Sequence, residues 1–145
     1  MSIRTIDPQQ AHDALSADDG VVYLDVRTEG EFRGGHPEGA LNIPAFLRSP
    51  AGGMAPNPEF LAVVQANYPA DSKLLIGCQM GGRSARACQE LAAAGYSDLA
   101  NVDGGFGGRR DPSGTMLVEG WQSRGLPTSN ATEGVSYDDL RARLG

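Results

Sequence analysis

The sequence predicts an α/β fold with a central, mainly parallel five-stranded sheet and helices on both of its faces. Short apolar, β-branched runs alternate along the chain with segments of helical periodicity, which is typical of successive strand–helix–strand units. The run 21–26 is apolar apart from Asp25, as expected for a strand covered by helices on both sides. The 145 residues, of which 40% are hydrophobic, suit one domain with one ordinary core.

Five runs carry the strand pattern: residues 3–6, 21–26, 40–43, 73–76 and 99–102. Five segments carry helical spacing or capping signals: residues 7–15, 28–33, 57–68, 84–94 and 136–144. Asp7 before Pro8 offers an N-cap and a first helical residue. Thr28 and Glu31 have the spacing of a capping box, which predicts a short helix there. The helices therefore connect the strands in the way that a parallel sheet requires.

Two stretches rich in proline and glycine, 48–56 and 107–114, predict irregular loops that could form a rim over a site. Residues 128–134 are polar and resemble a linker, and Ser136 is placed to cap the final helix. We therefore expect a domain over residues 1–128, followed by a polar linker and a short C-terminal helix over 129–145.

The composition argues against several functional classes. The net charge is −6, and no run of Lys or Arg offers a footprint for nucleic acid or an anionic membrane. No stretch approaches the roughly 18 apolar residues of a membrane span, and the first residues lack the apolar core of a secretion signal. Two cysteines are too few for a disulfide framework, and the two histidines lack zinc-ligand spacing. We therefore expect a metal-free protein of a reducing compartment, the cytoplasm.

Cys78 is the best candidate nucleophile in the chain. It follows the strand run 73–76 and precedes a turn with two adjacent glycines and then a helix. Such a turn can curl tightly, so that successive backbone N–H groups converge on the sulfur, with the positive end of the helix behind it. Thiols in these positions ionise more readily, and the thiolate is the nucleophile. A purely packing cysteine would not require this turn or Arg83 beside it.

Three groups of residues follow one another in a recognisable order. They are Leu24-Asp25-Val26-Arg27 with Glu31-Phe32 and the segment 35–44; Cys78 to Arg83; and Gly104-Gly105 with Trp121 and Gly125-Leu126-Pro127. Together they cover roughly residues 3–128 and resemble the signatures of the rhodanese family of sulfurtransferases.

The resemblance implies a rhodanese-like fold and sulfur transfer through a Cys78 persulfide. The implied donor is a small anion such as thiosulfate or a persulfide, the acceptor is a thiol, cyanide or a sulfur-acceptor protein, and no metal or organic cofactor is required. The implied substrate-binding residues are Gln79, Met80, Gly81, Gly82, Arg83 and Ser84. Arg83 would close the loop as an exposed cation that attracts the donor, and Ser84 is either the helix N-cap or a donor to the sulfur.

The resemblance also places Asp25 and Arg27 near the mouth of the active site. We favour a structural ion pair there, joined by Glu31 or His36, over a catalytic role, since a preformed thiolate needs no general base. Cys88 falls on the inward face of the helix after Cys78, where packing is expected rather than a resolving thiol.

Two alternatives stay open. A protein-to-protein sulfur relay would use the same loop with a protein partner, whereas a non-catalytic docking module of this family would typically lack the Cys, so Cys78 with Arg83 counts against it. Phosphatases and arsenate reductases of the same fold have one more residue between Cys and Arg, which widens the cradle for a tetrahedral oxyanion. Here four residues separate Cys78 from Arg83, and this shorter spacing favours sulfur.

Overall fold

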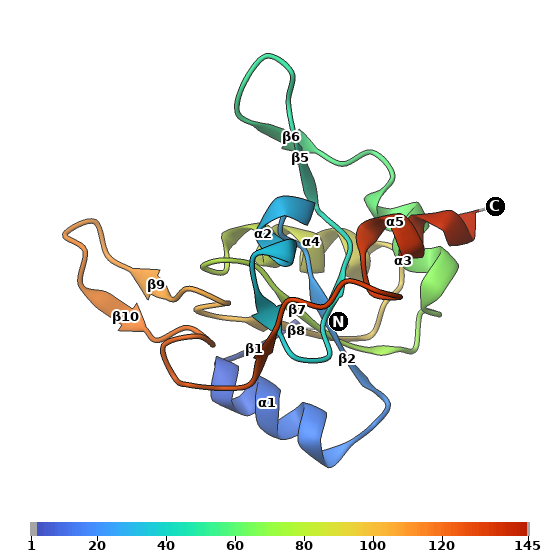
Figure 1. Cartoon of the computed structure of the whole chain (residues 1–145). Coiled ribbons are helices and arrows are strands. Elements are labelled where there is room, and N and C mark those ends of the chain that lie inside the picture. The colour runs from blue at the N-terminus through green and yellow to red at the C-terminus, as the bar shows by residue number, and fades with distance from the viewer. Residues whose placement is uncertain (1–2, 145) are drawn as a thin grey trace.

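The computed structural model describes residues 3–144 and is centred on a five-stranded sheet (Figure 1). The strands lie in the order β1 (Arg4–Ile6), β8 (Asp98–Val102), β7 (Lys73–Gly77), β2 (Val21–Asp25) and β4 (Leu41–Asn42). Every neighbouring pair is parallel, so the predicted parallel sheet and its five strands are confirmed. Because all strands point the same way, their carboxyl ends share one edge of the sheet, where sites form in such folds.

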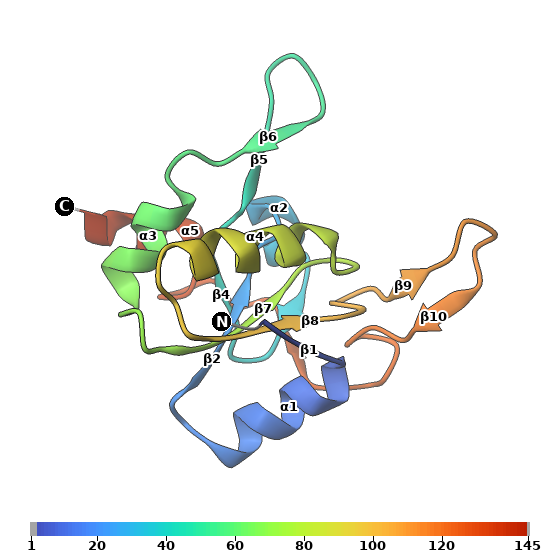
Figure 2. The same cartoon turned by 180° about the vertical axis from the view of Figure 1, so that it is seen from behind.

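Helices cover both faces of the sheet, as predicted (Figures 1 and 2). α1 (Pro8–Ala17) lies on one face, and α3 (Phe60–Asn67), α4 (Gly82–Ala93) and α5 (Tyr137–Arg141) lie on the other. Alternate residues of β7 pack against opposite helix layers. Leu74 and Ile76 are buried on the α4 side of the sheet, and Leu75 is buried on the α1 side. No helix within residues 3–144 is both long enough and apolar enough to cross a membrane.

Capping residues set most of the helix starts. Asp7 and Thr28 each form a capping box, the second at the start of α2 (Glu29–Arg33), and Ser136 caps α5. α4 begins earlier than predicted, at Gly82, and Gly81 takes the N-cap position with a φ of 135°. Ser84 therefore lies inside α4 and is not its cap, which corrects one of the two roles considered for it.

The two stretches expected to be irregular form β-hairpins instead. β5 (Phe46–Arg48) pairs with β6 (Met54–Pro56), and β9 (Arg109–Arg110) pairs with β10 (Met116–Val118), both antiparallel. Glycines occur in the turns, as at Gly52 and Gly53, where φ is 99° and 71°. The strands beside the turns are too short to show a period of two, so the sequence pattern did not reveal them. Both hairpins project from the body of the molecule (Figures 1 and 2).

The last part of the described chain packs against the domain. β11 (Thr128–Ser129) pairs antiparallel with β3 (His36–Pro37). Tyr137 and Leu140 of α5 are buried in the same hydrophobic cluster as α3, and a 3₁₀ turn, η1 (Ala142–Leu144), follows. The final helix thus contributes to the core on the α4 side of the sheet.

Candidate active site

Cys78 lies at the carboxyl end of β7, the central strand of the sheet. Its side chain is 2% exposed. Gly77, the last residue of β7, packs so closely against Tyr23 of β2 that any Cβ would collide with the phenol. A glycine is therefore required there, and β7 delivers the sulfur to the base of the turn that leads into α4.

We call residues 78–83 the turn. Polar groups of this turn and of the adjacent Ser84 surround the Cys78 sulfur. The amide of Gly81 donates to Sγ at 3.1 Å and the amide of Ser84 donates to it at 3.4 Å. The Ser84 hydroxyl also lies 3.4 Å from Sγ. Gly81 reaches its position with a positive φ that residues with a Cβ rarely adopt. The sulfur thus lies at the N-terminus of α4, within hydrogen-bond distance of backbone amides that point toward it.

A second segment, residues 104–107, holds the turn in this shape, and we call it the clamp. Three hydrogen bonds run from its amides to carbonyls of the turn: Phe106 to Cys78 at 2.8 Å, Gly107 to Gln79 at 2.8 Å and Gly104 to Met80 at 2.9 Å. In a trans peptide the N–H points away from the preceding C=O. The clamp therefore turns the amides of residues 79, 80 and 81 toward the inside of the turn.

The clamp depends on its adjacent glycines. Gly105 has a φ of 53° and lies so close to the Cys78 carbonyl that a Cβ would overlap it. In the sequence, Gly104 and Gly105 were recognisable only as part of a signature. At Gly105 the missing side chain allows the backbone to approach the active-site turn, whereas a Cβ on Gly104 would collide with Val118 of β10.

Asp25 and Arg27 form a buried ion pair beside the turn. Arg27 Nη2 lies 2.8 Å from Asp25 Oδ2, and neither side chain is more than 3% exposed. The same guanidinium donates to the Gly35 carbonyl at 2.7 Å and to Gln79 Oε1 at 3.3 Å. It also lies over the Phe106 ring, 4.5 Å from the centroid. The pair therefore ties β2 to both the turn and the clamp, and the expected ion pair is present.

Glu31 and His36, considered as further partners of that pair, bond elsewhere. Arg83 Nη1 and Nη2 donate to the two Glu31 oxygens at 2.8 and 3.0 Å. Burial alone would raise the Glu31 pKa, but hydrogen bonds from Arg83 and Thr28 outweigh it and lower the pKa to about 2. Arg83 is 20% exposed and is paired with Glu31, so the expectation of an exposed cation is corrected. His36 Nδ1 lies 2.7 Å from the Phe32 carbonyl, and its ring stacks on Phe32.

Comparison of the sequence with known protein families supports the resemblance described above. The profile of the rhodanese-like domain family matches residues 7–108, which include the turn and the clamp.

This chain belongs to the rhodanese family. It is 39% identical over 118 residues to thiosulfate sulfurtransferase 16 of Arabidopsis thaliana, a chloroplastic protein, with 81% of this chain and 86% of that protein covered. It is 45% identical over 104 residues to thiosulfate sulfurtransferase 18 of the same plant, with coverages of 70% and 74%. The crystal structure of Rv0390 from M. tuberculosis superposes with a TM-score of 0.73 at 29% identity, covering 90% of this chain and 100% of that one. The predicted family and fold are confirmed.

Asn101 of β8 supports the rhodanese turn and was missed in the sequence analysis. The Ser84 hydroxyl lies 2.5 Å from Asn101 Oδ1 and 3.1 Å from the Gly81 carbonyl. Asn101 Nδ2 donates to the same carbonyl at 3.4 Å. Asn101 thus fixes both the N-cap residue and the hydroxyl that faces the Cys78 sulfur. The available signal was an amide side chain between two buried apolar residues, Ala100 and Val102.

The other loop residues of this rhodanese domain lie around the sulfur rather than against it. Met80 is 55% exposed at the tip of the turn. Gln79 is partly buried and is held by its bond to Arg27. Gly82 is exposed as the first residue of α4. Of the six residues predicted to bind substrate, Gly81 and Ser84 are the ones with hydrogen bonds to Sγ.

Cys88 is fully buried in α4, within the hydrophobic cluster on that face of the sheet. Burial, followed by the nearby charge of Cys78, raises the pKa of Cys88 to about 12. It therefore remains a thiol at neutral pH and packs as predicted. Within residues 3–144, no group of three or more His, Cys, Asp and Glu side chains is arranged to hold a metal ion.

Proposed function

We propose that this protein is a sulfurtransferase that carries a sulfane sulfur on Cys78. It takes the sulfur from thiosulfate or a persulfide donor and passes it to a thiol or to cyanide. The observation that carries the proposal is the Cys78 sulfur at the base of a cradle of backbone amides. The names of the two Arabidopsis relatives, both thiosulfate sulfurtransferases, support the same chemistry.

In the first step the Cys78 thiolate attacks the outer sulfur of thiosulfate. A new sulfur–sulfur bond forms at Cys78, the bond between the two donor sulfurs breaks, and sulfite leaves with its electron pair. The persulfide anion that remains is stabilised by the amides that the clamp turns inward. Because these donors are already oriented, forming the persulfide needs little reorganisation of the backbone.

In the second step an acceptor thiolate or cyanide attacks the outer sulfur of the persulfide. The sulfur–sulfur bond breaks, Cys78 leaves as a thiolate, and the acceptor departs with the transferred sulfur. This is two-step covalent catalysis, for which ping-pong kinetics are expected. Both steps balance without a metal, an organic cofactor or an external oxidant.

Two features favour the transfer of a single sulfur atom over the transfer of a larger group such as phosphoryl. Cys78 is 2% exposed, so the donor must present a terminal sulfur while the rest of the donor stays outside. The four residues between Cys78 and Arg83 form a narrower turn than the one in phosphatases of this fold. Arg83 would contact an anionic donor while it remains bonded to Glu31. We place this chemistry in a reducing compartment, the cytoplasm, because it needs Cys78 as a thiolate.

The test is intact mass spectrometry after incubation with thiosulfate. The wild type should gain one sulfur, about 32 mass units, and lose it again on addition of cyanide with formation of thiocyanate. Cys78→Ser should gain nothing, whereas Cys88→Ser, the matched control at the other cysteine, should gain the same mass as the wild type. A sulfur adduct on Cys78→Ser would place the carrier elsewhere. Faster turnover of an aryl phosphate than formation of thiocyanate would replace the proposal with oxyanion chemistry.

A further inference from the structure

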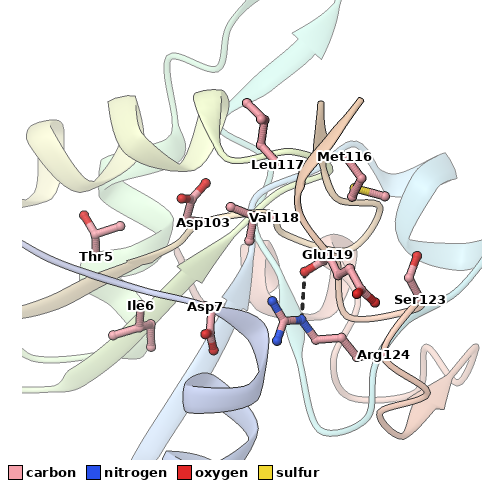
Figure 3. A pocket seen from close by; sticks show the side chains of 10 residues that line it. All are labelled: Thr5, Ile6, Asp7, Asp103, Met116, Leu117, Val118, Glu119, Ser123 and Arg124. Carbon is pink, nitrogen blue, oxygen red and sulfur yellow. Dashed lines mark hydrogen bonds between the residues drawn. The ribbon is translucent and has the colours of Figure 1, made fainter. Parts of the chain in front are cut away.

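A groove of about 730 Å³ lies between the N-terminal strand and the second projecting hairpin (Figure 3). Thr5 and Ile6 of β1 line one side, together with Asp7. Met116–Val118 of β10 and Glu119 line the other. The catalytic steps described above use none of these residues.

The groove adjoins the active-site turn. Asp103 lines the groove and lies against the turn, since a Cβ on Gly81 would be 3.7 Å from Asp103 Oδ1. The next residue, Gly104, is the clamp residue whose amide binds the Met80 carbonyl. A molecule in the groove would therefore lie beside the tip of the turn that holds Cys78.

Two of the strands that line the groove, β1 and β10, each have one edge that is unpaired within the described part of the chain. β1 is the outermost strand of the five-stranded sheet, and β10 pairs with β9 alone. Among residues 3–144, no strand pairs with the other edge of either one. Free strand edges present backbone N–H and C=O groups that pair with an added extended segment. The groove therefore suits an extended polypeptide better than a compact small molecule.

The side chains indicate the character of that segment. Three carboxylates line the groove, those of Asp7, Asp103 and Glu119, together with the cation of Arg124. Asp103 is paired with Arg109, whose Nε lies 2.7 Å from Asp103 Oδ1. Within residues 3–144, the groove carboxylates without an ion pair are therefore those of Asp7 and Glu119. Arg124 donates to the Glu119 backbone carbonyl, and the exposed Glu119 carboxylate has no partner among the described residues. Leu117 is 53% exposed on β10, close to the groove. An occupant with alternating cationic and apolar side chains would complement this surface.

We propose that the groove binds an extended, basic and apolar segment of a sulfur-acceptor protein, and that strand addition there brings the acceptor's thiol to Cys78. This inference rests on the proposed function. The acceptor thiolate attacks the outer sulfur of the Cys78 persulfide, the sulfur–sulfur bond breaks, and the acceptor leaves as a persulfide while Cys78 returns to the thiolate. The groove thus selects which peptide segment binds, and the turn that holds Cys78 carries out the sulfur transfer.

The experiment separates binding from transfer. A fluorescent peptide of alternating Lys and Val around a central Cys is titrated into Cys78→Ser protein, and anisotropy is measured. A peptide with Glu in place of Lys, and a Lys peptide with prolines that block strand pairing, serve as controls. We expect the Lys peptide to bind about tenfold more tightly than either control. Equal affinities of the three peptides would overturn the proposal.

Variants then locate the site. Leu117→Lys and Glu119→Lys should each slow sulfur transfer to the Lys peptide about tenfold, with cyanide turnover unchanged. Met54→Lys is the matched control, because Met54 is 46% exposed on β6 of the other hairpin. An equal loss in Met54→Lys, or no loss in the groove variants, would refute the assignment.

Two results distinguish the possible failures. If the wild type makes no thiocyanate while the peptide still binds at the groove, the proposed function fails and the binding site stands. If sedimentation shows a dimer that Leu117→Lys dissociates, the occupant is a second copy of this chain, and the acceptor-protein proposal is wrong.

Discussion

Replacing Glu31 with glutamine removes the charge that is paired with Arg83 and little else. The new side-chain amide would keep an oxygen that accepts from Thr28, so the capping box of α2 survives. Arg83 would lose its bidentate carboxylate partner while it remains 20% exposed. The variant therefore isolates the ion pair from the helix cap.

The size of the effect follows from the Glu31 pKa. Lowering this pKa from 4.5 to about 2 corresponds to about 3 kcal/mol of native-state stabilisation. Thr28 supplies part of it, and solvent screens a pair whose side chains are 20% and 30% exposed. We therefore expect a loss of about 1–2 kcal/mol at neutral pH, or a fall in Tm of about 3–8 °C.

The pH dependence has a defined sign. The folded-state pKa is depressed, so the stabilisation is complete above about pH 4.5 and is lost as the pH falls through about 2. The Tm difference between wild type and Glu31→Gln should be constant from about pH 5 to 8 and should shrink below about pH 4.5. Thermal melts followed by circular dichroism across this range measure it.

Glu29→Gln is the matched control, because Glu29 lies in the same first turn of α2 without an ion pair among the described residues. Glu29→Gln should lower Tm by less than Glu31→Gln does, and its Tm difference from the wild type should not shrink in the same way below about pH 4.5. A Glu31→Gln loss no larger than that of Glu29→Gln, or a difference that does not narrow in acid, would refute the reasoning.

Three further predictions concern the turn. Gly105→Ala should slow sulfur transfer by at least about tenfold and lower stability, because the new Cβ would overlap the Cys78 carbonyl; unchanged thiosulfate kinetics would contradict the clamp. Arg83→Ala should lower kcat/KM for thiosulfate whereas Glu31→Gln should raise it, and equal values in steady-state assays would show that the pair does not face the donor. Cys88→Ser should retain most of the activity, with pH-dependent alkylation of Cys78 as in the wild type; a large loss in a folded variant would revive the resolving-thiol hypothesis.

The sequence predicted the sheet because strands that are buried on both faces have continuous apolar runs, and it predicted the helices from their capping signals. A continuous apolar run such as that of β7 admits few other interpretations, and capping boxes fix helix starts locally. The two hairpins were missed because β9 and β10 are two and three residues long, too short for a periodic signal.

The candidate site likewise has features that the sequence predicted and features that it did not. Cys78 and its turn are local in sequence, so the glycines and the following helix were enough to find them. The partners of Arg83 and Ser84 were not predictable from spacing, since Glu31 and Asn101 reach them from other elements of the fold. The clamp likewise lies on a separate loop, and its hydrogen bonds are between backbone groups that carry no residue identity.

The clamp also bears on how such a turn could acquire a different substrate. Three of its amides bind the carbonyls of residues 78, 79 and 80, so this first half of the turn cannot widen while the clamp stays in place. Breaking three such bonds would cost on the order of 1.5–4.5 kcal/mol. We therefore expect that a residue added within 78–80 would not make an oxyanion site by itself, and that widening this part of the turn for phosphate would require changes in both loops together.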